Sequence, residues 1–266
     1  MDQPSIPVGQ PRTALITGAS SGIGGAFTRL LAREGWHVVA VGRDRGRLDA
    51  LAEEVGAEVL VADLLDAHDL AAVEDRVRAG VQLLVNNAGY TTYGSFADLG
   101  LEPELGQLTL HTAVPLRLCH AAAQTMAPGS RIINIASLAG LSAAPGLASY
   151  AASKAALISL SESLHHELRS KQVTVTCVCA GYTRTELQTR AGVDASALPS
   201  PMWATPEFVA TKALSASERG HALVIPGRLN ALTATLMRHL PRSVARRAAA
   251  NTYGKVQPLE QILTAH

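Results

Sequence analysis

Short apolar runs alternate with longer amphipathic patterns along most of this 266-residue chain. The first run, Thr13–Thr17, precedes a helical pattern over Ile23–Glu34, and the alternation continues to Ala222–Ile225. A strand, a helix and a second strand in succession give a right-handed crossover and therefore parallel strands. The sequence predicts an α/β fold, a Rossmann-type doubly wound parallel sheet of about seven strands with helices on both faces.

The intervening segments follow the same alternation, and we expect the whole chain, 1–266, to form a single domain. The remaining strands are expected at His37–Val41, Glu58–Ala62, Val81–Asn86, Arg131–Ala136 and Val173–Cys179, and the remaining helices near Arg45–Val55, Ala67–Ala79, Leu101–Met126 and Ser149–Arg169.

Three segments depart from the alternation. Thr185–Thr205 is long and irregular, which predicts a substrate lid, and it ends on Thr205-Pro206-Glu207, a typical helix start. After Gly227 we expect a helical tail, near 228–266, made of two helices separated by Pro241. Met1–Pro11 is expected to be a short disordered or wrapped arm.

Composition excludes several classes of protein. The net charge of +1 argues against a broad surface for nucleic acid. The sequence shows no signal peptide, no run long enough to span a bilayer and no metal-ligand cluster, so we expect a cytoplasmic protein without a metal. The three cysteines do not suggest a disulfide framework, and Cys177 and Cys179 are expected to be buried on one strand face.

A glycine-rich turn links the first strand to the first helix and reads Thr17-Gly-Ala-Ser-Ser-Gly-Ile-Gly24. Glycines let a diphosphate approach the backbone, and the helix that follows offers free N–H groups and the positive end of its dipole. The turn predicts a dinucleotide site. The residues expected to line it are Gly18, Ser20, Ser21, Gly22, Ile23 and Gly24.

The second strand ends without the carboxylate that an NAD site usually uses to bind the ribose 2′-hydroxyl. Gly42 occupies that position and Arg43 follows it. An arginine pairs with a 2′-phosphate through charge-assisted hydrogen bonds, and Ser20 offers a further hydroxyl. These residues predict NADPH/NADP+ as the cofactor, with a solvated surface arginine as the alternative. Asp63 is expected either to accept a bond from the adenine amino group or to cap the next helix.

Tyr150 and Lys154 lie four residues apart and so share one helix face. A nearby ammonium and the cationic nicotinamide are expected to lower the tyrosine pKa from about 10 toward the range that acid–base catalysis needs. Ser137 closes the fifth strand, at the sheet edge where a ligand should lie, and its hydroxyl can orient a carbonyl toward the tyrosine.

With these motifs in this order, the sequence resembles the short-chain dehydrogenase/reductase family from about Arg12 to Gly227. It matches the family's glycine motif at Thr17–Gly24, its Asn-Asn-Ala-Gly segment at Asn86–Gly89 and its Ser…Tyr-x-x-x-Lys core. The resemblance implies an oxidoreductase that transfers hydride between the nicotinamide and a carbonyl or secondary alcohol. The helices near 101–126 and 149–169 would form a homodimer or homotetramer.

The resemblance also implies roles for single residues. Lys154 would bind the nicotinamide ribose, Thr185 would hold the carboxamide, and Asn86 would brace the central strands. The other residues implied at the cofactor are Leu64, Asn87, Ala88, Gly89, Tyr150, Gly181 and Thr183. Two departures matter: Ala180 replaces the proline of a Pro-Gly motif, and His111 takes the place of a fourth catalytic residue, an asparagine that supports the proton relay. An unperturbed His111 would titrate near pH ~6.5, so turnover should fall at acidic pH. The alternative is that His111 lies outside the relay and only packs or hydrogen-bonds within its helix.

The substrate is expected to be a hydrophobic small molecule because the presumed cleft residues are mostly apolar. Two alternatives stay open: a cofactor-dependent epimerase or dehydratase, and a non-catalytic NADP(H)-binding regulator. Arg238, Arg242, Arg246 and Arg247 in Leu229–Val256 would suit either a membrane surface or, more simply, a solvated helix face. Core packing is the alternative explanation for several of the expected cleft residues, which are Leu138, Ala143, Ala144, Leu147, Tyr182, Leu187, Met202 and Trp203.

Overall fold

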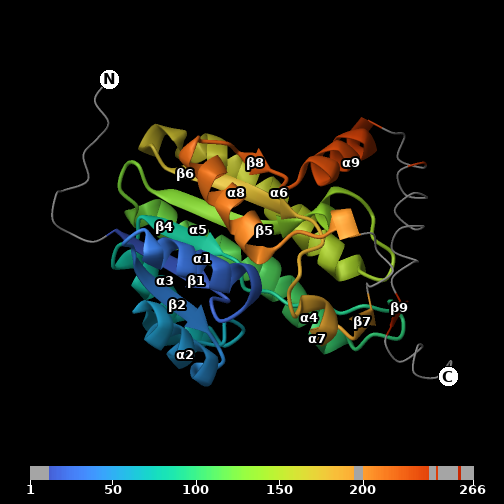
Figure 1. Cartoon of the computed structure of the whole chain (residues 1–266), viewed down its shortest axis with the longest axis horizontal. Helices are drawn as coiled ribbons and strands as arrows, with labels where there is room; N and C mark the ends of the chain where they lie inside the picture. Colours follow the sequence, from blue (N-terminus) through green and yellow to red (C-terminus); the bar gives the residue numbers. More distant parts are fainter. Residues whose placement is uncertain (1–11, 195–199, 240–243, 245–256, 259–266) are drawn as a thin grey trace.

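A parallel sheet forms the centre of the molecule. The computed structural model describes residues 12–194, 200–239, 244 and 257–258, and in that part seven strands form a sheet in the order β3-β2-β1-β4-β5-β6-β8 (Figure 1). All of its pairings are parallel, which confirms the expected doubly wound sheet. The strands are β1 (Thr13–Thr17), β2 (His37–Gly42), β3 (Glu58–Val61), β4 (Leu83–Asn86), β5 (Arg131–Ser137), β6 (Thr174–Ala180) and β8 (Leu223–Val224).

Helices cover both faces of this sheet. On one face, α1 (Gly22–Arg33), α2 (Arg45–Val55) and α8 (Pro206–Glu218) contribute to one apolar cluster. On the other face, α3 (Ala67–Arg78), α5 (Val114–Thr125) and the C-terminal part of α6 (Ala148–Glu167) meet a second cluster. Successive side chains of a strand point to opposite faces, so Ala14 and Ile16 of β1 join the first cluster and Leu15 joins the second.

The strand order creates the position for a ligand. From β1 the chain builds outward through β2 to β3, and it then returns to place β4 on the other side of β1. The connections after β1 and β4 therefore diverge and leave a crevice at the carboxyl ends of these strands. The motifs identified in the sequence follow these strand ends.

Local capping fixes where several helices begin. The Asp44 carboxylate accepts the Arg47 N–H at 3.0 Å and begins α2, and Asp66 caps α3 through two N–H groups. Thr205 accepts the Phe208 N–H at 3.2 Å, with Pro206 as the first residue of α8, as the sequence predicts. Side-chain acceptors satisfy N–H groups that a helix start leaves unpaired.

The helix expected over Leu101–Met126 is not uniform. It consists of α4 (Leu101–Leu108), a π-helical turn at Thr109–Ala113 and α5. Pro115 has no N–H to donate to the carbonyl of residue 111, which explains why the regular bonding pattern is lost at this point. Such turns often occur at functional sites, and this one carries His111.

The segment after β6 is more ordered than its composition predicts. It contains α7 (Leu187–Arg190), β7 (Val193–Asp194), which pairs with β9 (Gln257–Pro258), and a 3₁₀ turn at Ser200–Met202. The expectation of one long irregular stretch was therefore wrong for its described parts. Short 3₁₀ turns at Leu138–Leu141 and Leu168–Lys171 flank α6.

The first of the two tail helices is present as α9 (Arg228–His239). Met1–Pro11 and most of the predicted second tail helix lie outside the described residues. Of its described positions, Val244 is helical, whereas Gln257–Pro258 form β9, so the helical prediction was wrong at these two residues. Among the described helices, none combines the length and the apolar character that crossing a membrane requires.

Candidate active site

A cleft of about 790 Å³ opens at the carboxyl ends of the strands. It runs from the glycine-rich turn and the end of β2 to the start of α6 and the segment after β6. With one exception, Gly24, every residue predicted for catalysis or cofactor binding lines it. These are Gly18, Ser20, Ser21, Gly22, Ile23, Arg43, Asp63, Leu64, Asn87, Ala88, Gly89, His111, Ser137, Tyr150, Lys154, Gly181, Thr183 and Thr185.

The glycine-rich turn needs its glycines for two different reasons. Gly18 has a φ of +65°, and a Cβ there would lie 2.9 Å from the Ala88 Cα. A Cβ on Gly24 would lie 2.1 Å from the Gly18 carbonyl oxygen, so Gly24 allows close packing behind the turn and does not line the cleft. The bare backbone and the α1 N-terminus behind it form a cradle that fits a dinucleotide diphosphate.

Asparagines tie this cradle to the sheet. Asn87 Nδ2 donates to the Thr17 carbonyl at 2.9 Å and to the Gly18 carbonyl at 3.2 Å. Asn86, on the preceding position, donates to Asn134 Oδ1 at 2.8 Å and so links β4 to β5. These bonds fix the ends of three neighbouring strands relative to one another.

The far end of the cleft carries the arginine predicted to recognise a 2′-phosphate. Arg43 follows Gly42 directly, is 66% exposed and lies 3.8 Å from the Asp63 carboxylate. Asp63 Oδ1 also accepts the Leu65 N–H at 3.0 Å, while Asp66 caps α3. Asp63 therefore orders the turn before α3 and does not cap the helix itself.

Ser137, Tyr150 and Lys154 converge at the deep end. Ser137 ends β5 and hydrogen-bonds the Tyr150 side chain from the first turn of α6. Lys154 Nζ donates to the Ile135 carbonyl at 2.9 Å and lies 5.7 Å from the centre of the Tyr150 ring. Three residues from two elements thus meet at one point, although no sequence spacing alone brings Ser137 to the other two.

The protonation of this group differs from the expectation. Burial raises the pKa of Tyr150, and the hydrogen bond from Ser137 lowers it only in part. Among the protein's own residues, Lys154 therefore does not lower the Tyr150 pKa as predicted, and the lowering expected from the cationic nicotinamide stays a prediction. Lys154 itself is 5% exposed, and burial lowers its pKa to about 8.

His111 lies beside the tyrosine. It is 1% exposed, its ring centre is 5.5 Å from that of Tyr150, and the two rings meet edge to face. Its Nδ1 lies 3.1 Å from Ser153 Oγ, which donates its own proton to the Tyr150 carbonyl at 2.8 Å. Ser153 must therefore accept from His111, so Nδ1 carries the proton and Nε2 has the free lone pair.

That lone pair has no hydrogen-bond partner in the described part of the chain. It points toward Gly89, where a Cβ would lie 2.5 Å from Nε2. Burial first, and then the charge of Lys154, hold the pKa of His111 well below its usual value. The expectation that His111 titrates near pH ~6.5 was therefore wrong, because the imidazole stays neutral across the physiological range.

The family model described as short chain dehydrogenase matches residues 12–195. This chain belongs to the short-chain dehydrogenase family.

Individual relatives agree with this assignment. Nodulation protein G of Rhizobium meliloti (strain 1021) is 38% identical over 179 residues, which cover 64% of this chain and 73% of the relative. A short-chain dehydrogenase from Sphingobium yanoikuyae in complex with NADPH has a TM-score of 0.75 at 35% identity, covering 87% of this chain and 97% of that one. The bulky-bulky ketone specific alcohol dehydrogenase from Comamonas testosteroni has a TM-score of 0.70 at 31% identity, covering 87% and 96%.

One departure of this dehydrogenase from its family's motifs has a visible consequence. Ala180, at the position of the motif proline, continues β6 to its last residue and pairs with Ser137 of β5. Beyond it, Thr183 is buried and its hydroxyl donates to the Gly181 carbonyl at 3.0 Å. The turn after β6 is thus held by a side-chain bond.

The dehydrogenase also has a buried polar network that the motifs did not predict. The Glu104 carboxylate of α4 accepts from the hydroxyls of Thr92 and Ser149, and Gln107 Nε2 donates to Ser149 Oγ at 2.8 Å. Ser149 precedes Tyr150 directly. The network therefore ties the start of α6 to α4, and only the acidic first turn of α4 signals it in the sequence.

Most of the residues expected to contact substrate lie outside the cleft itself. Of that set, Leu187 lines it. Tyr182 and Trp203 contact each other with ring centres 5.7 Å apart, and burial raises the pKa of Tyr182 to about 12. Ala144 and Leu147 instead join an apolar cluster with Tyr150. Leu138 belongs to a third cluster, with Cys177 and Cys179, both of which are buried as predicted.

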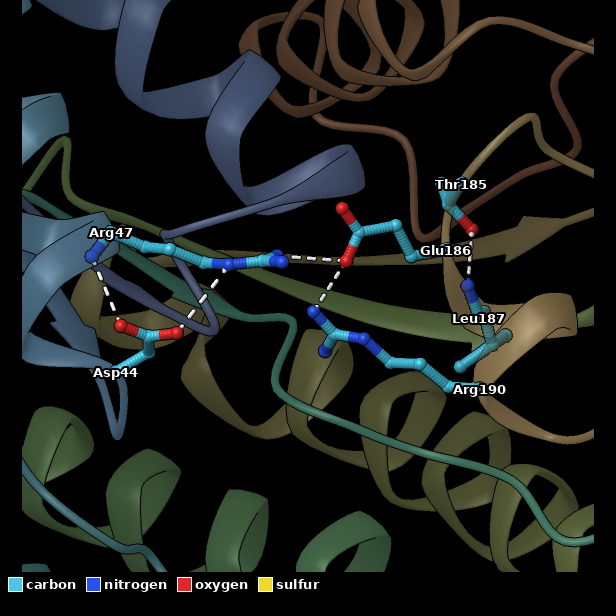
Figure 2. A network of polar contacts seen from close by, with 6 residues as sticks. All are labelled: Asp44, Arg47, Thr185, Glu186, Leu187 and Arg190. Carbon is cyan, nitrogen blue, oxygen red and sulfur yellow. Dashed lines mark hydrogen bonds and ion pairs between the residues drawn. The ribbon is translucent and has the colours of Figure 1, made fainter.

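The rim carries an ion-pair network that sequence reasoning missed (Figure 2). Glu186, after β6, lies between Arg47 of α2 and Arg190 of α7, and Asp44 contacts Arg47 from the other side. All four residues line the cleft. The i, i+4 spacing of Glu186 and Arg190 was readable in the sequence, but the pairing with Arg47 spans 139 positions.

Asp66, His68 and Asp69 gather at the start of α3 with ligand atoms within 4.8 Å of one another. Their carboxylates already accept backbone N–H groups, from His68 and Asp69 to Asp66 and from Asp63 to Asp69. The hydrogen bonds that cap the start of α3 therefore explain why these three side chains lie close together.

Proposed function

We propose that this protein is an NADPH-dependent oxidoreductase that interconverts a carbonyl and a secondary alcohol on a mostly hydrophobic small molecule. One observation carries the proposal. Ser137, Tyr150 and Lys154 meet at the deep end of a cleft whose other end holds a glycine cradle and the Arg43 guanidinium. Acid–base groups and a dinucleotide cradle in one cleft are the requirements of hydride-transfer chemistry.

The residues present fit this cofactor. The glycine turn, with Ser20, Ser21 and Ile23, would receive the diphosphate, and Arg43 would pair with the 2′-phosphate. The NADPH complex of the Sphingobium yanoikuyae relative supports this choice. When bound, reduced nicotinamide supplies a hydride for the carbonyl carbon.

The side chains of the protein supply the proton. Tyr150, held protonated by burial and oriented by its bond to Ser137, is placed to donate its phenolic proton to the substrate oxygen. Ser137 would also donate to that oxygen and hold it against the phenol. Lys154, charged below pH about 8, would stabilise the phenolate that remains after transfer.

His111 is proposed to take over the relay role of the family's asparagine. Its neutral ring presents an acceptor at Nε2, buried next to Gly89, while Nδ1 is fixed by Ser153. A buried acceptor without a partner is unfavourable, so a water that donates to Nε2 would both satisfy it and begin a path from Lys154 to solvent.

The proposed substrate class rests on the side chains beyond the catalytic group. Leu110 and Leu187 add apolar surface to the cleft. The relative from Comamonas testosteroni, described as specific for bulky-bulky ketones, supports a bulky hydrophobic ketone over a charged metabolite.

Isotope transfer tests the proposal. NADPH carrying deuterium at the nicotinamide C4 position is mixed with the protein and a panel of hydrophobic ketones and aldehydes. Retention of the label at the new carbinol carbon, with one NADPH consumed per alcohol, is the expected result. Tyr150→Phe should abolish it.

The same experiment separates the alternatives. An epimerase or dehydratase would convert its substrate without net NADPH consumption, and a non-catalytic regulator would bind NADPH with no labelled product from any carbonyl. Either outcome would overturn the proposed reaction while leaving the family assignment intact.

We also propose that the protein is a homo-oligomer. Large apolar side chains on α4 and α5 are exposed, among them Leu101, Leu105 and Leu116, and Phe96 lies just before them. Exposed apolar patches of this kind mark association surfaces. Light scattering should give a mass of two or four chains, and a monomer at micromolar concentration would contradict this.

A further inference from the structure

An ion pair crosses the cleft at its rim and is not used by the proposed chemistry. Arg47 lies in the first turn of α2, and Glu186 lies on the opposite side, between Thr185 and α7 (Figure 2). Arg47 Nη1 donates to Glu186 Oε2 at 2.8 Å. Because both residues line the cleft, this single contact joins its two sides.

Asp44 holds the Arg47 side chain in position on the side away from Glu186. The Asp44 carboxylate accepts the Arg47 N–H at 3.0 Å through Oδ1, and its Oδ2 lies 3.4 Å from Arg47 Nε. Asp44 also caps α2, so the position of the guanidinium depends on a fixed helix end. Arg47 thus presents its outer nitrogen to Glu186 from a rigid base.

The Glu186 carboxylate is oriented by Arg190 of the helix that follows it, α7. Arg190 contacts the same Glu186 oxygen from one helical turn further along. This pair remains within the segment Thr185–Arg190 and does not cross the cleft. It directs the carboxylate but cannot fasten the segment to the rest of the protein.

The segment also approaches the glycine cradle. A Cβ on Gly22 would lie 3.0 Å from Thr185 Cγ2. Thr185–Arg190 therefore reaches from the N-terminus of α1 at Thr185 to α2 at Glu186, and so borders the part of the cleft that would receive the diphosphate. A bound cofactor would have to pass this segment to leave.

We propose that the Arg47–Glu186 ion pair is a latch that fastens Thr185–Arg190 beside the cofactor cradle and sets how long the cofactor stays bound. The inference rests on the proposed use of NADPH. It assigns a function to two residues outside the catalytic group and the glycine motif. Breaking the pair removes this link between the segment and α2, so release becomes faster while the hydride-transfer step is unchanged.

Stopped-flow release of NADPH tests the latch. The enzyme–NADPH complex is mixed with excess NADP+, and the loss of NADPH fluorescence gives the dissociation rate constant. Glu186→Gln should raise it about threefold, a modest factor because both side chains are about half exposed and the pair is screened by water. In a protein already carrying Arg47→Gln, the Glu186→Gln change should have no further effect.

Two matched variants serve as controls. Glu54→Gln breaks the Arg29–Glu54 pair, which has the same 2.8 Å separation and similar exposure but lies away from the cleft. Arg190→Gln removes the contact within the segment and leaves the crossing pair. Neither should raise the dissociation rate constant as much as Glu186→Gln.

The direction in which Glu186→Gln changes the NADPH dissociation rate constant decides whether the ion pair acts as a latch. Unchanged release, or slower release because the lost carboxylate had repelled the cofactor phosphates, would overturn the latch. An equal increase in Glu54→Gln would overturn it as well. A wild-type protein that binds no NADPH would instead overturn the proposed function on which the latch depends.

Discussion

Lys154 and Arg47 line the same cleft and carry the same formal charge, yet their surroundings differ. Lys154 is 5% exposed and has one carbonyl partner, and burial lowers its pKa to about 8. The Arg47 side chain is 44% exposed and lies between two carboxylates, so its charge is fixed at any physiological pH. The deep end holds a group that can release a proton, and the rim holds a permanent cation.

The difference shows that the two ends of one cleft suit two tasks, proton transfer and cofactor binding. Proton transfer needs a group whose pKa lies near the working pH, and burial provides that shift. Holding an anionic cofactor needs charges that do not titrate, and exposed arginines provide them at little desolvation cost. Substitutions in the buried end should therefore have large effects on rate, and substitutions at the rim smaller effects on binding.

Apart from Tyr150→Phe, the largest effect is expected for Lys154→Met. Turnover should fall by about 10²-fold or more, because the phenolate of Tyr150 loses its stabilising charge. Steady-state rates at saturating cofactor and substrate measure it. Retention of wild-type turnover would show that the buried ammonium has no part in the chemistry.

The same variant tests the pKa shift through stability. Folding lowers the Lys154 pKa from 10.5 to about 8, so between these values the unfolded chain binds more protons. Wild-type stability should then rise with pH from about 8 toward 10.5, and the full penalty should be present below about 8. In denaturant titrations, the stability of Lys154→Met relative to wild type should be greatest at pH 7 and decline by pH 10; a pH-independent difference would contradict the shift.

Arg43→Ala tests whether the exposed Arg43 at the rim of the cleft binds the 2′-phosphate of NADPH. The Kd for NADPH should rise about tenfold through loss of a charge-assisted bond, a moderate value because the guanidinium is exposed. The Kd for NADH should change little. Fluorescence titrations of both cofactors measure this, with Arg45→Ala, an exposed neighbour at the start of α2, as the control. Equal losses for both cofactors would remove Arg43 from 2′-phosphate recognition.

His111 is buried, as Lys154 is, but its ring is neutral, so we expect its substitutions to have intermediate effects. His111→Asn keeps an acceptor and should retain turnover within about threefold, whereas His111→Phe should lose about tenfold or more. Because its pKa is held well below 6.5, the wild-type pH–rate profile should show no limb near that pH. A limb near pH 6.5 that disappears in His111→Asn would contradict the buried, neutral ring.

The smallest effect concerns an ion pair away from the cleft. Arg76, and to a lesser degree His37, hold the pKa of Glu58 down to about 2, although the Glu58 side chain is 37% exposed. A lowered carboxyl pKa stabilises the fold above the unfolded value of about 4.5, and this is lost as pH falls toward about 2. Glu58→Gln should cost less than about 1 kcal/mol at pH 7 by denaturant titration. If Glu58→Gln lowered the free energy of unfolding by the same amount at pH 2 as at pH 7, the lowered pKa of Glu58 would not be the source of the stabilisation.

The fold and the cofactor cradle could be predicted because their signals are local. The apolar runs gave the strands to within a residue or two, and Gly18 and Gly24 reflect backbone contacts that only glycine allows. Tyr150 and Lys154 share a helix face, and Ser137 ends a strand, so their convergence follows from the sheet topology.

The features that could not be predicted depend on contacts between residues far apart in the sequence and on burial. Arg47 and Glu186 meet across 139 positions, and no local pattern indicates this. The pKa values of Tyr150 and His111 were misjudged because spacing shows a charged neighbour but not the extent of burial, which dominates both shifts. The ordered turns within Thr185–Thr205 depend in part on β9, far along the chain.

The division between a chemical end and a cofactor-holding rim is tested most directly by single-turnover hydride transfer, measured with the cofactor Kd in Tyr150→Phe and Arg43→Ala. We expect opposite patterns for the two variants. Tyr150→Phe should lose about 10²-fold or more in the single-turnover rate with an unchanged Kd for NADPH, and Arg43→Ala should show a raised Kd with an unchanged rate at saturation. If Tyr150→Phe transfers hydride at the wild-type rate, or if both variants lose rate and affinity together, the division is wrong.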